Sequence, residues 1–288
     1  MTTPIPVDYV PLDHCQLAYR RTGTGEALLL LHGYPVNGLT WRHVTPSLSE
    51  HFTCYVVDLP GAGETRWSER TDFGFMAQAE TIRDFVNALG LDSYSILAHD
   101  TGGTIARQLA LIDGSRVQRL ALIGTEIPHH RPAWIPLFQK ISNPRQTGLF
   151  RTLLSKKWFL NSSAGLGGCF YDHALIHGEF YREIIAPVIA SKHKASGLIH
   201  YLRGIDFDLV DRLGTEHANI TAPTLLIWGE HDTVFPVERA REMIPQLGNC
   251  KGFVVVPDAR LFVQEEKPHT VARLVEEFMI HGREFSVQ

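Results

Sequence analysis

The sequence predicts an α/β fold, in which a mostly parallel, doubly wound sheet carries an inserted helical segment. Two observations predict the sheet. Short, continuously apolar runs are typical of parallel strands covered on both faces, and they alternate with segments whose apolar residues recur at helical spacing. A third observation predicts the insertion, because residues 126–215 interrupt this alternation and contain no clear strand.

Six apolar runs are expected to form strands. They are residues 27–31 (ALLLL), 53–58 (TCYVVD), 94–98, 119–123, 224–228 and 251–256. Between the second and third runs, residues 75–89 place apolar side chains at helical spacing, and Gly90 follows as a helix C-cap. Residues 104–112 and 268–280 are also expected to be helices.

The interruption defines the expected domain organisation. We expect a core made of residues 1–125 and 216–288, and a helical cap made of residues 126–215. A segment of this length is too long to be a simple loop in a compact domain. Open α/β sheets bind ligands at the carboxyl ends of their strands, so the cap is expected to cover an active site there.

The composition gives no sign of nucleic acid or of a membrane as the partner. The formal net charge of −4 and the pI of about 6.4 favour neither nucleic acid nor an anionic membrane. No apolar run is long enough for a transmembrane helix, and the first residues do not resemble a secretory signal. We therefore expect a cytoplasmic protein that acts on a small-molecule substrate, and a homodimer is left open.

No cofactor is expected. The four cysteines are scattered without a CxxC pair or a metal-binding spacing, which indicates reduced thiols. The sequence also lacks a GxGxxG motif after the first strand, a P-loop and a cluster of metal ligands.

The strongest motif is the hexapeptide Ala98-His99-Asp100-Thr101-Gly102-Gly103, which lies between an expected strand and an expected helix. This is the setting of a nucleophile elbow, a strained turn that needs small neighbours. Ala98 and Gly102 meet that need two residues either side of Asp100. Taken alone, the same hexapeptide fits a polar loop at the end of any strand.

Other motifs follow the expected strands in a consistent order. They are HGYP at residues 32–35, DLPGAG at 58–63, LLIWGEHD at 225–232 and the closing segment 256–268. Together they resemble the α/β-hydrolase superfamily over the whole core. An aspartate at the elbow resembles the branch that contains the epoxide hydrolases, the haloalkane dehalogenases and the haloacetate dehalogenases.

The resemblance implies roles for individual residues. Asp100 matches the nucleophile, and the backbone N–H groups of Tyr34 and Thr101 match the donors of the oxyanion hole. Asp232 matches the acid that orients a catalytic histidine. Glu126 falls where some dehalogenases keep that acid instead, although a carboxylate at a helix cap or at the cap hinge is the alternative.

An aspartate suits attack on a saturated carbon. Its carboxylate is ionised at neutral pH, with an unperturbed pKa of about 3.9, and needs no base to become a nucleophile. Attack on an epoxide or a carbon–halogen bond gives an alkyl-enzyme ester. Water must then attack the ester, normally with help from a histidine, and the oxyanion needs donors.

The sequence departs from the family at three places in the chain. The ungapped match places Arg260 and Leu261 on the Gly-His pair that carries the catalytic histidine, and leucine cannot accept a proton. Thr101 stands where haloalkane dehalogenases have a halide-binding tryptophan. Leu202 falls on the tyrosine that polarises the epoxide in epoxide hydrolases, with Tyr201 one position away.

Another histidine could replace the missing base and activate the water. His99 is expected to point into the core because neighbouring side chains alternate, but it also remains a candidate substrate contact beside the nucleophile. His32 is expected to be structural. The remaining candidates could serve only if the cap folds over the site; they include His129, His130, His173, His177, His193 and His200.

The pocket wall is expected to be aromatic, since aromatic side chains line most ligand sites. Candidate substrate contacts in the cap are Trp134, Phe138, Trp158, Phe159 and Tyr201. For each of them, packing inside the cap is the alternative.

Three interpretations of function remain. The first is a hydrolase of the epoxide or carbon–halogen type that uses Asp100, with an unidentified group to release the ester. The second is a non-hydrolytic enzyme, such as a lyase, isomerase or cyclase, in which Asp100 acts as an acid or base. The third is a ligand-binding or inactive homologue.

Overall fold

A single sheet forms the centre of the molecule. The computed structural model describes residues 5–286 and contains a nine-stranded sheet in the order β1-β2-β4-β3-β6-β7-β8-β9, with β5 paired to β2. The strands are β1 (Asp8–Pro11), β2 (Cys15–Thr22), β3 (Glu26–Leu31), β4 (Phe52–Asp58), β5 (Arg66–Trp67), β6 (Tyr94–His99), β7 (Val117–Ile123), β8 (Thr224–Gly229) and β9 (Cys250–Val256). Neighbouring strands from β4 to β9 pair in parallel, which confirms the mostly parallel sheet.

Helices cover both faces of this sheet. The α-helices are α1 (Thr45–Leu48), α2 (Phe75–Ala88), α3 (Thr101–Ile112), α4 (Trp134–Ile141), α5 (Gly148–Leu154), α6 (Lys157–Leu160), α7 (Ala186–Ala190), α8 (Lys192–Gly204), α9 (Phe207–Glu216), α10 (Val237–Ala240), α11 (Val263–Glu266) and α12 (Pro268–Met279). Short 3₁₀ turns and one π turn at Tyr181–Ile185 connect them.

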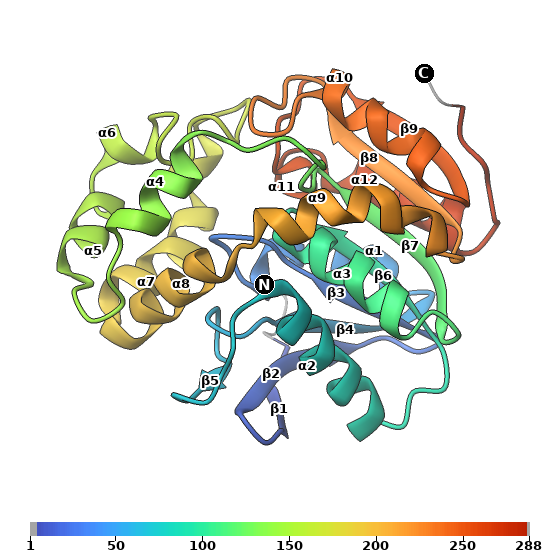
Figure 1. Ribbon diagram of the computed structural model, residues 1–288, viewed down its shortest axis with the longest axis horizontal. Helices are drawn as coiled ribbons and strands as arrows, with labels where there is room; N and C mark the ends of the chain where they lie inside the picture. The colour runs from blue at the N-terminus through green and yellow to red at the C-terminus, as the bar shows by residue number, and fades with distance from the viewer. Residues whose placement is uncertain (1–4, 287–288) are drawn as a thin grey trace.

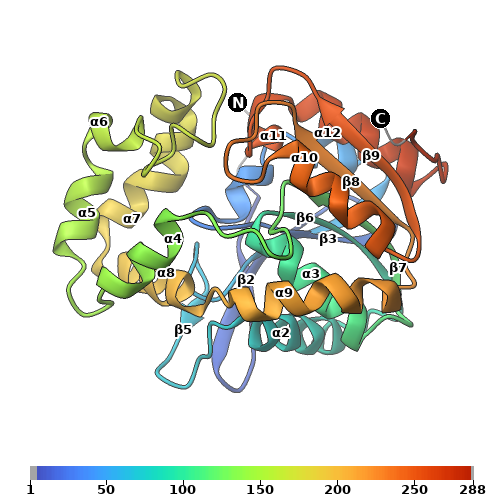
Figure 2. The same ribbon diagram turned by 45° about the horizontal axis from the view of Figure 1, so that its top comes forward.

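Alternate residues of each strand pack against different helices. Leu29 and Leu31 of β3 pack with α2, α3 and α9 in one apolar cluster, whereas Leu28 and Leu30 pack with α1 and α12 in another. Figures 1 and 2 show these two layers on opposite sides of the sheet. Burial on both faces explains why the central strands are apolar along their whole length.

The sequence did not reveal β1 and β2. Both pair antiparallel at one edge of the sheet, and each contains exposed or partly exposed residues as well as buried ones. A search for continuously apolar runs therefore misses them, because a half-exposed antiparallel strand keeps polar side chains on its solvent face. The six predicted strands and three predicted helices are confirmed, with ends that differ by a few residues.

The segment between β7 and β8 is helical. The structure describes every residue from 124 to 223, and none of them belongs to a strand. Helices α4–α8 form a lobe beside the sheet, while α9 lies along α2 and α3 (Figures 1 and 2). Within the described residues, no helix is both long and apolar enough to cross a membrane.

Candidate active site at the end of β6

Asp100 lies in the turn between β6 and α3. Its backbone has φ 52° and ψ −131°, a conformation that a non-glycine residue adopts only under strain. Three contacts hold the turn: the Asp100 N–H donates to the Gly124 carbonyl at 2.9 Å, the Thr125 hydroxyl donates to the Asp100 carbonyl at 2.9 Å, and Gly102 approaches His32 closely. A Cβ at Gly102 would lie 2.3 Å from the His32 carbonyl oxygen, so the turn needs glycine there.

The carboxylate of Asp100 accepts backbone hydrogen bonds from two different loops. The Tyr34 N–H donates to its Oδ2 at 2.8 Å, and the Thr101 N–H is the second donor. The structure thus brings together Asp100, Tyr34 and Thr101, which the resemblance had singled out. The carboxylate of Asp100 therefore lies against two backbone donors, which is the kind of group that an oxyanion hole requires.

Electrostatics around Asp100 oppose its ionisation. Burial, followed by the charge of Glu126, raises the pKa of Asp100 well above its ordinary value, whereas the two backbone N–H groups lower it. Glu126 is itself buried and does not line the cavity beside Asp100. It accepts hydrogen bonds from Thr104 Oγ1 at 2.6 Å and Thr125 Oγ1 at 3.2 Å. Glu126 therefore belongs to a packed polar cluster behind the elbow.

Arg107 is the residue of this cluster that sequence reasoning missed. It is fully buried and donates to Thr104 Oγ1 at 2.8 Å, Thr125 Oγ1 at 3.0 Å and the Glu126 carbonyl at 2.8 Å. Burial lowers the pKa of its guanidinium to about 10, which leaves it charged at neutral pH. The only signal in the sequence was a single arginine within an otherwise apolar helix.

Leu261 lies between the elbow and Asp232. It is buried and lines the same cavity as Asp100. A Cβ built on Gly124 would lie 3.0 Å from Leu261 Cδ1 and 3.4 Å from Asp232 Oδ2, which places these two side chains against one another. No proton-accepting side chain occupies the position that the family match assigns to the histidine.

Only one of the two carboxylate oxygens of Asp232 accepts hydrogen bonds from residues 5–286. Its Oδ1 accepts from the Val234 N–H at 2.8 Å and the Phe235 N–H at 2.9 Å, whereas its buried Oδ2 has no hydrogen-bond partner among the described residues. Burial raises the pKa of Asp232 to about 7. A buried carboxylate oxygen without a donor is costly, so this atom marks a place where a partner is missing.

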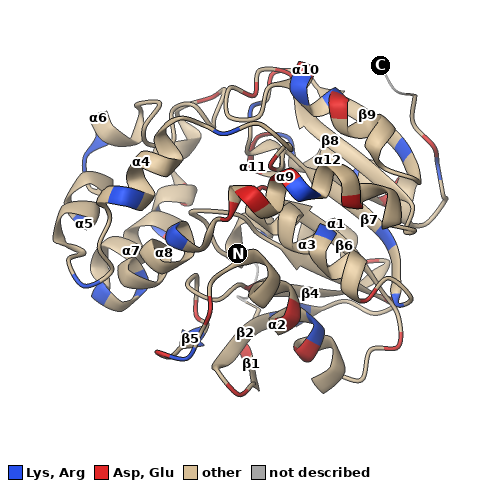
Figure 3. Cartoon of the chain, viewed as in Figure 1, with Lys and Arg blue, Asp and Glu red and all other residues tan. Residues whose placement is uncertain are grey.

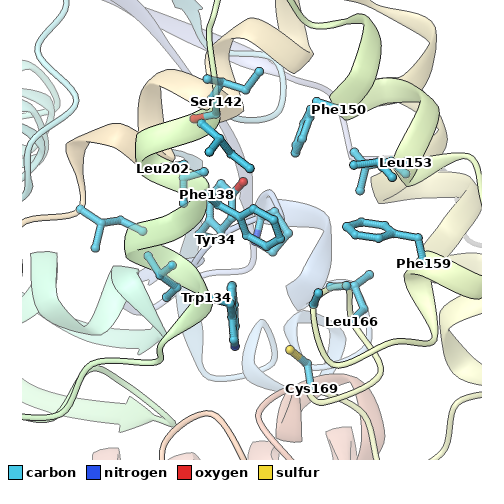
Figure 4. Close-up of a pocket in the computed structure, with 18 of the residues that line it drawn as sticks. Tyr34, Trp134, Phe138, Ser142, Phe150, Leu153, Phe159, Leu166, Cys169 and Leu202 are labelled. Atoms are coloured by element: carbon cyan, nitrogen blue, oxygen red, sulfur yellow. The ribbon is translucent and has the colours of Figure 1, made fainter.

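A cavity of about 210 Å³ opens in front of Asp100. Its wall is mostly apolar, and Figure 4 shows side chains from α4, α5 and the following loops around it. The polar lining residues are Tyr34, Asp100, Thr101, Ser142, Asn143, Gln146 and Cys169. Because Asp100 is the only charged residue among them, the cavity suits an apolar ligand.

Some of the predicted wall residues line the cavity and others do not. Trp134, Phe138 and Phe159 line the cavity, as does Leu202. Trp158 does not line it, because its side chain points out of α6 into solvent. Tyr201 does not line it either. Its hydroxyl lies 2.8 Å from Thr101 Oγ1, in a fully buried position behind the nucleophile. Trp158 and Tyr201 therefore lie outside the cavity wall, and their contact with substrate stays a prediction.

No histidine lines the cavity within residues 5–286. His99 is fully buried, and its Nε2 lies 3.0 Å from the Leu261 carbonyl oxygen. Burial lowers its pKa to about 3, which keeps the ring neutral. His99 lies outside the cavity wall, because along a strand the residue before the elbow points to the opposite side from Asp100. Its contact with substrate stays a prediction.

The part of the chain that the structure describes holds no group of three or more His, Cys, Asp or Glu side chains arranged to bind a metal ion.

Comparisons with known proteins identify the family of the chain. The alpha/beta hydrolase fold family matches residues 26–268. Human epoxide hydrolase 4 is 26% identical over 299 aligned positions, which cover 94% of this chain and 78% of that protein. Haloalkane dehalogenase 2 of Mycobacterium tuberculosis is 27% identical over 287 positions and 90% of each chain.

Among solved structures, the epoxide hydrolase CorEH without ligand superposes with a TM-score of 0.79 at 24% identity, over 97% of this chain and 100% of that chain. At that identity the likeness concerns the fold alone. The family match spans most of the chain, including the elbow, the Tyr34 loop and the loop of Leu261. The chain belongs to the α/β-hydrolase fold family, and its homologues include epoxide hydrolases and haloalkane dehalogenases.

Proposed function

We propose that this protein is an enzyme in which Asp100 attacks a saturated carbon of an apolar epoxide or organohalide and forms an alkyl-enzyme ester. One observation carries the proposal. A strained carboxylate faces an apolar cavity, and backbone N–H groups from two loops hold it. A general acid or a structural carboxylate needs neither the strained turn nor the paired donors.

The two leaving groups place different demands on the site. An opened epoxide leaves an alkoxide that must gain a proton, whereas a halide leaves as an anion that needs donors. The side chain of Tyr34 lines the cavity, and burial, followed by the Asp100 charge, raises the pKa of its hydroxyl. This hydroxyl keeps its proton at neutral pH and can donate it. Thr101 offers no indole donor for a halide. These features support an epoxide more than a haloalkane.

The size of the cavity limits the substrate. A dry cavity of about 150 Å³ holds benzene, so the cavity of about 210 Å³ has room for roughly eight to ten non-hydrogen atoms. A longer substrate would extend through the opening. We further propose that residues 126–215 act as the cap of this site, with the lobe of α4–α8 supplying the apolar wall.

Release of the ester is the step that lacks a base, because Leu261 stands where the resemblance places the catalytic histidine. Hydrolysis breaks the bond between Cγ of Asp100 and the ester oxygen, adds a water oxygen to Cγ and requires removal of a proton from that water. Leu261 cannot take the proton, and Asp232 is buried and does not line the cavity. We therefore expect a long-lived ester unless the substrate itself, or a second nucleophile, completes the cycle.

The test is the intact mass of the protein after incubation with a panel of epoxides and haloalkanes. A lasting mass increase that peptide mapping assigns to Asp100 is the expected result. Diol or alcohol that accumulates without an adduct would show that another group activates water. If the protein forms neither an adduct nor a product with any member of the panel, the nucleophile proposal is wrong.

A second candidate is a non-hydrolytic enzyme in which Asp100 is a general acid or base. The raised pKa values of Asp100 and Asp232 favour it, because a carboxyl group that holds its proton near neutral pH can donate that proton. Consumption of substrate without an adduct, and without oxygen from labelled water in the product, would support this candidate. A ligand-binding homologue would show binding without turnover.

A further inference from the structure

The outer side of the helical lobe exposes large apolar side chains. We define the α4–α6 face by Leu137, Ile141, Leu149 and Trp158, which are 55%, 63%, 70% and 66% exposed. Two of these, Ile141 and Leu149, also line the cavity, so the cavity opens on this face. Clustered exposed apolar side chains beside a ligand cavity usually mark an interaction site.

The helices that carry this face, and the loops between them, are also cationic. Residues 134–171 contain five Lys or Arg residues and no Asp or Glu. Four of the five, Lys140, Arg145, Lys156 and Lys157, are exposed, and none forms an ion pair within residues 5–286. Figure 3 shows Lys and Arg, but no Asp or Glu, on α4–α6. The whole chain is nevertheless acidic, with a net charge of −4, so this local charge is the opposite of the average.

We propose that the α4–α6 face docks on an anionic lipid surface, with its apolar side chains in the headgroup region and its cations at the lipid phosphates. Apolar and aromatic residues flanked by Lys and Arg are the composition of interfacial membrane-binding elements. Lysine fits this arrangement because its apolar stem can lie along the interface while its ammonium group stays in water. Anionic lipids attract each such cation within a Debye length.

Other occupants explain fewer of these features. A two-fold dimer through this face would bring its four unpaired cations against the same four of a second copy, because a two-fold interface pairs one patch with itself. Nucleic acid or an acidic protein would match the charge, but would leave the four exposed apolar side chains without a role. An anionic lipid surface matches both properties.

Docking has a consequence for the ligand. Because the cavity opens on the α4–α6 face, a lipid-dissolved ligand would reach Asp100 without crossing bulk water. This consequence rests on the proposed function, whereas the docking itself does not depend on any reaction at Asp100.

The docking is tested by sedimentation of the full-length protein with vesicles. We expect binding to vesicles that contain phosphatidylglycerol, little binding to pure phosphatidylcholine vesicles, and loss of binding as ionic strength rises. Lys156→Glu/Lys157→Glu should weaken binding at least about tenfold. The matched control is Arg70→Glu/Arg212→Glu, which changes the net charge equally at two exposed positions outside the α4–α6 face. The control should bind like the wild type.

Two further measurements separate lipid from other partners. Vesicles of brominated phosphatidylglycerol should quench tryptophan fluorescence, and Trp158→Phe should remove most of that quenching, since the indole of Trp158 is the one that lies exposed on this face. Leu137→Ser/Trp158→Ser should weaken vesicle binding without changing the oligomeric state measured by light scattering. Equal binding to neutral and anionic vesicles would overturn the proposal. So would heparin binding as tight as vesicle binding and unaffected by the apolar variant, or a dimer that the apolar variant dissociates.

Discussion

The elbow after β6 and the loop after β9 face the same cavity, but only the elbow has its full set of partners. At the elbow, backbone donors and the cluster behind Thr125 support Asp100. At the loop, Leu261 lies near an Asp232 oxygen that has no hydrogen-bond partner within residues 5–286. If the proposed function holds, the groups for attack and the groups for release can be separated. Attack would depend on backbone geometry that the fold supplies, whereas release would depend on the side chain at position 261.

The largest effect is expected at the intact elbow. Asp100→Ala should lower the rate of adduct formation or substrate consumption by at least roughly a thousandfold, because the nucleophilic oxygen is removed. Intact-mass kinetics measure the adduct, and chromatography measures the substrate. Asp92→Ala, at an exposed carboxylate, is the matched control. Wild-type rates in Asp100→Ala would contradict every role for this residue.

Leu261→His should repair the incomplete loop. The new imidazole would lie between the elbow and the unpartnered Oδ2 of Asp232, so release of a preformed ester should accelerate by roughly a hundredfold to ten-thousandfold. The decay of the adduct mass after removal of excess substrate measures this rate.

Two controls sharpen the repair experiment. Leu261→Gln is close to histidine in volume and has a polar side chain but no base, so it should leave the adduct long-lived. Leu261→His/Asp232→Asn should lose part of the gain, because the imidazole then lacks its anionic partner. An adduct lifetime that is the same in Leu261→His as in the wild type would show that the missing base does not limit release.

The pH dependence of attack should report the environment of Asp100. Attack needs the carboxylate, and burial raises the pKa of Asp100 above its ordinary value of 3.8. The rate of adduct formation should therefore be constant at high pH and fall about tenfold per pH unit below the raised pKa. Single-turnover mass kinetics with an acid-stable epoxide measure the profile. A rate that stays constant down to the ordinary pKa of an aspartate would contradict the raised value.

The smallest effect concerns stability at the incomplete loop. The pKa of Asp232 is about 7 in the folded chain against an ordinary 3.8, so the folded state holds this proton more tightly than the unfolded state. Stability contributed by Asp232 is present below the ordinary pKa and is lost as pH rises toward about 7.

Asp232→Asn does not titrate. Its Tm relative to the wild type should therefore rise by up to several degrees between acidic and mildly alkaline pH. Thermal melts at matched ionic strength check this, with Asp92→Asn as the control. A Tm difference that does not change with pH would show that the carboxylate is not destabilised by its burial.

Sequence alone determined the core of this protein, because its signals are local. Continuous apolar runs predicted the central strands, and the small residues around Asp100 predicted the elbow that the structure contains. The resemblance also assigned roles to Tyr34 and to the position of Leu261, because their motifs follow the expected strands in the order typical of the family.

Only the tertiary structure decided which side chains share the cavity. Trp134 and Trp158 are both aromatic residues of the same helical segment, yet one lines the cavity and the other faces solvent. Tyr201 contacts Thr101 and Arg107 contacts His217, and each pair is at least 100 residues apart in the sequence, so no local pattern encodes these contacts. The net charge of the chain is a sum over all residues, so it does not reveal that cations gather on the α4–α6 face. Burial and electrostatic fields depend on distances in space, and distances between distant segments exist only in the folded chain.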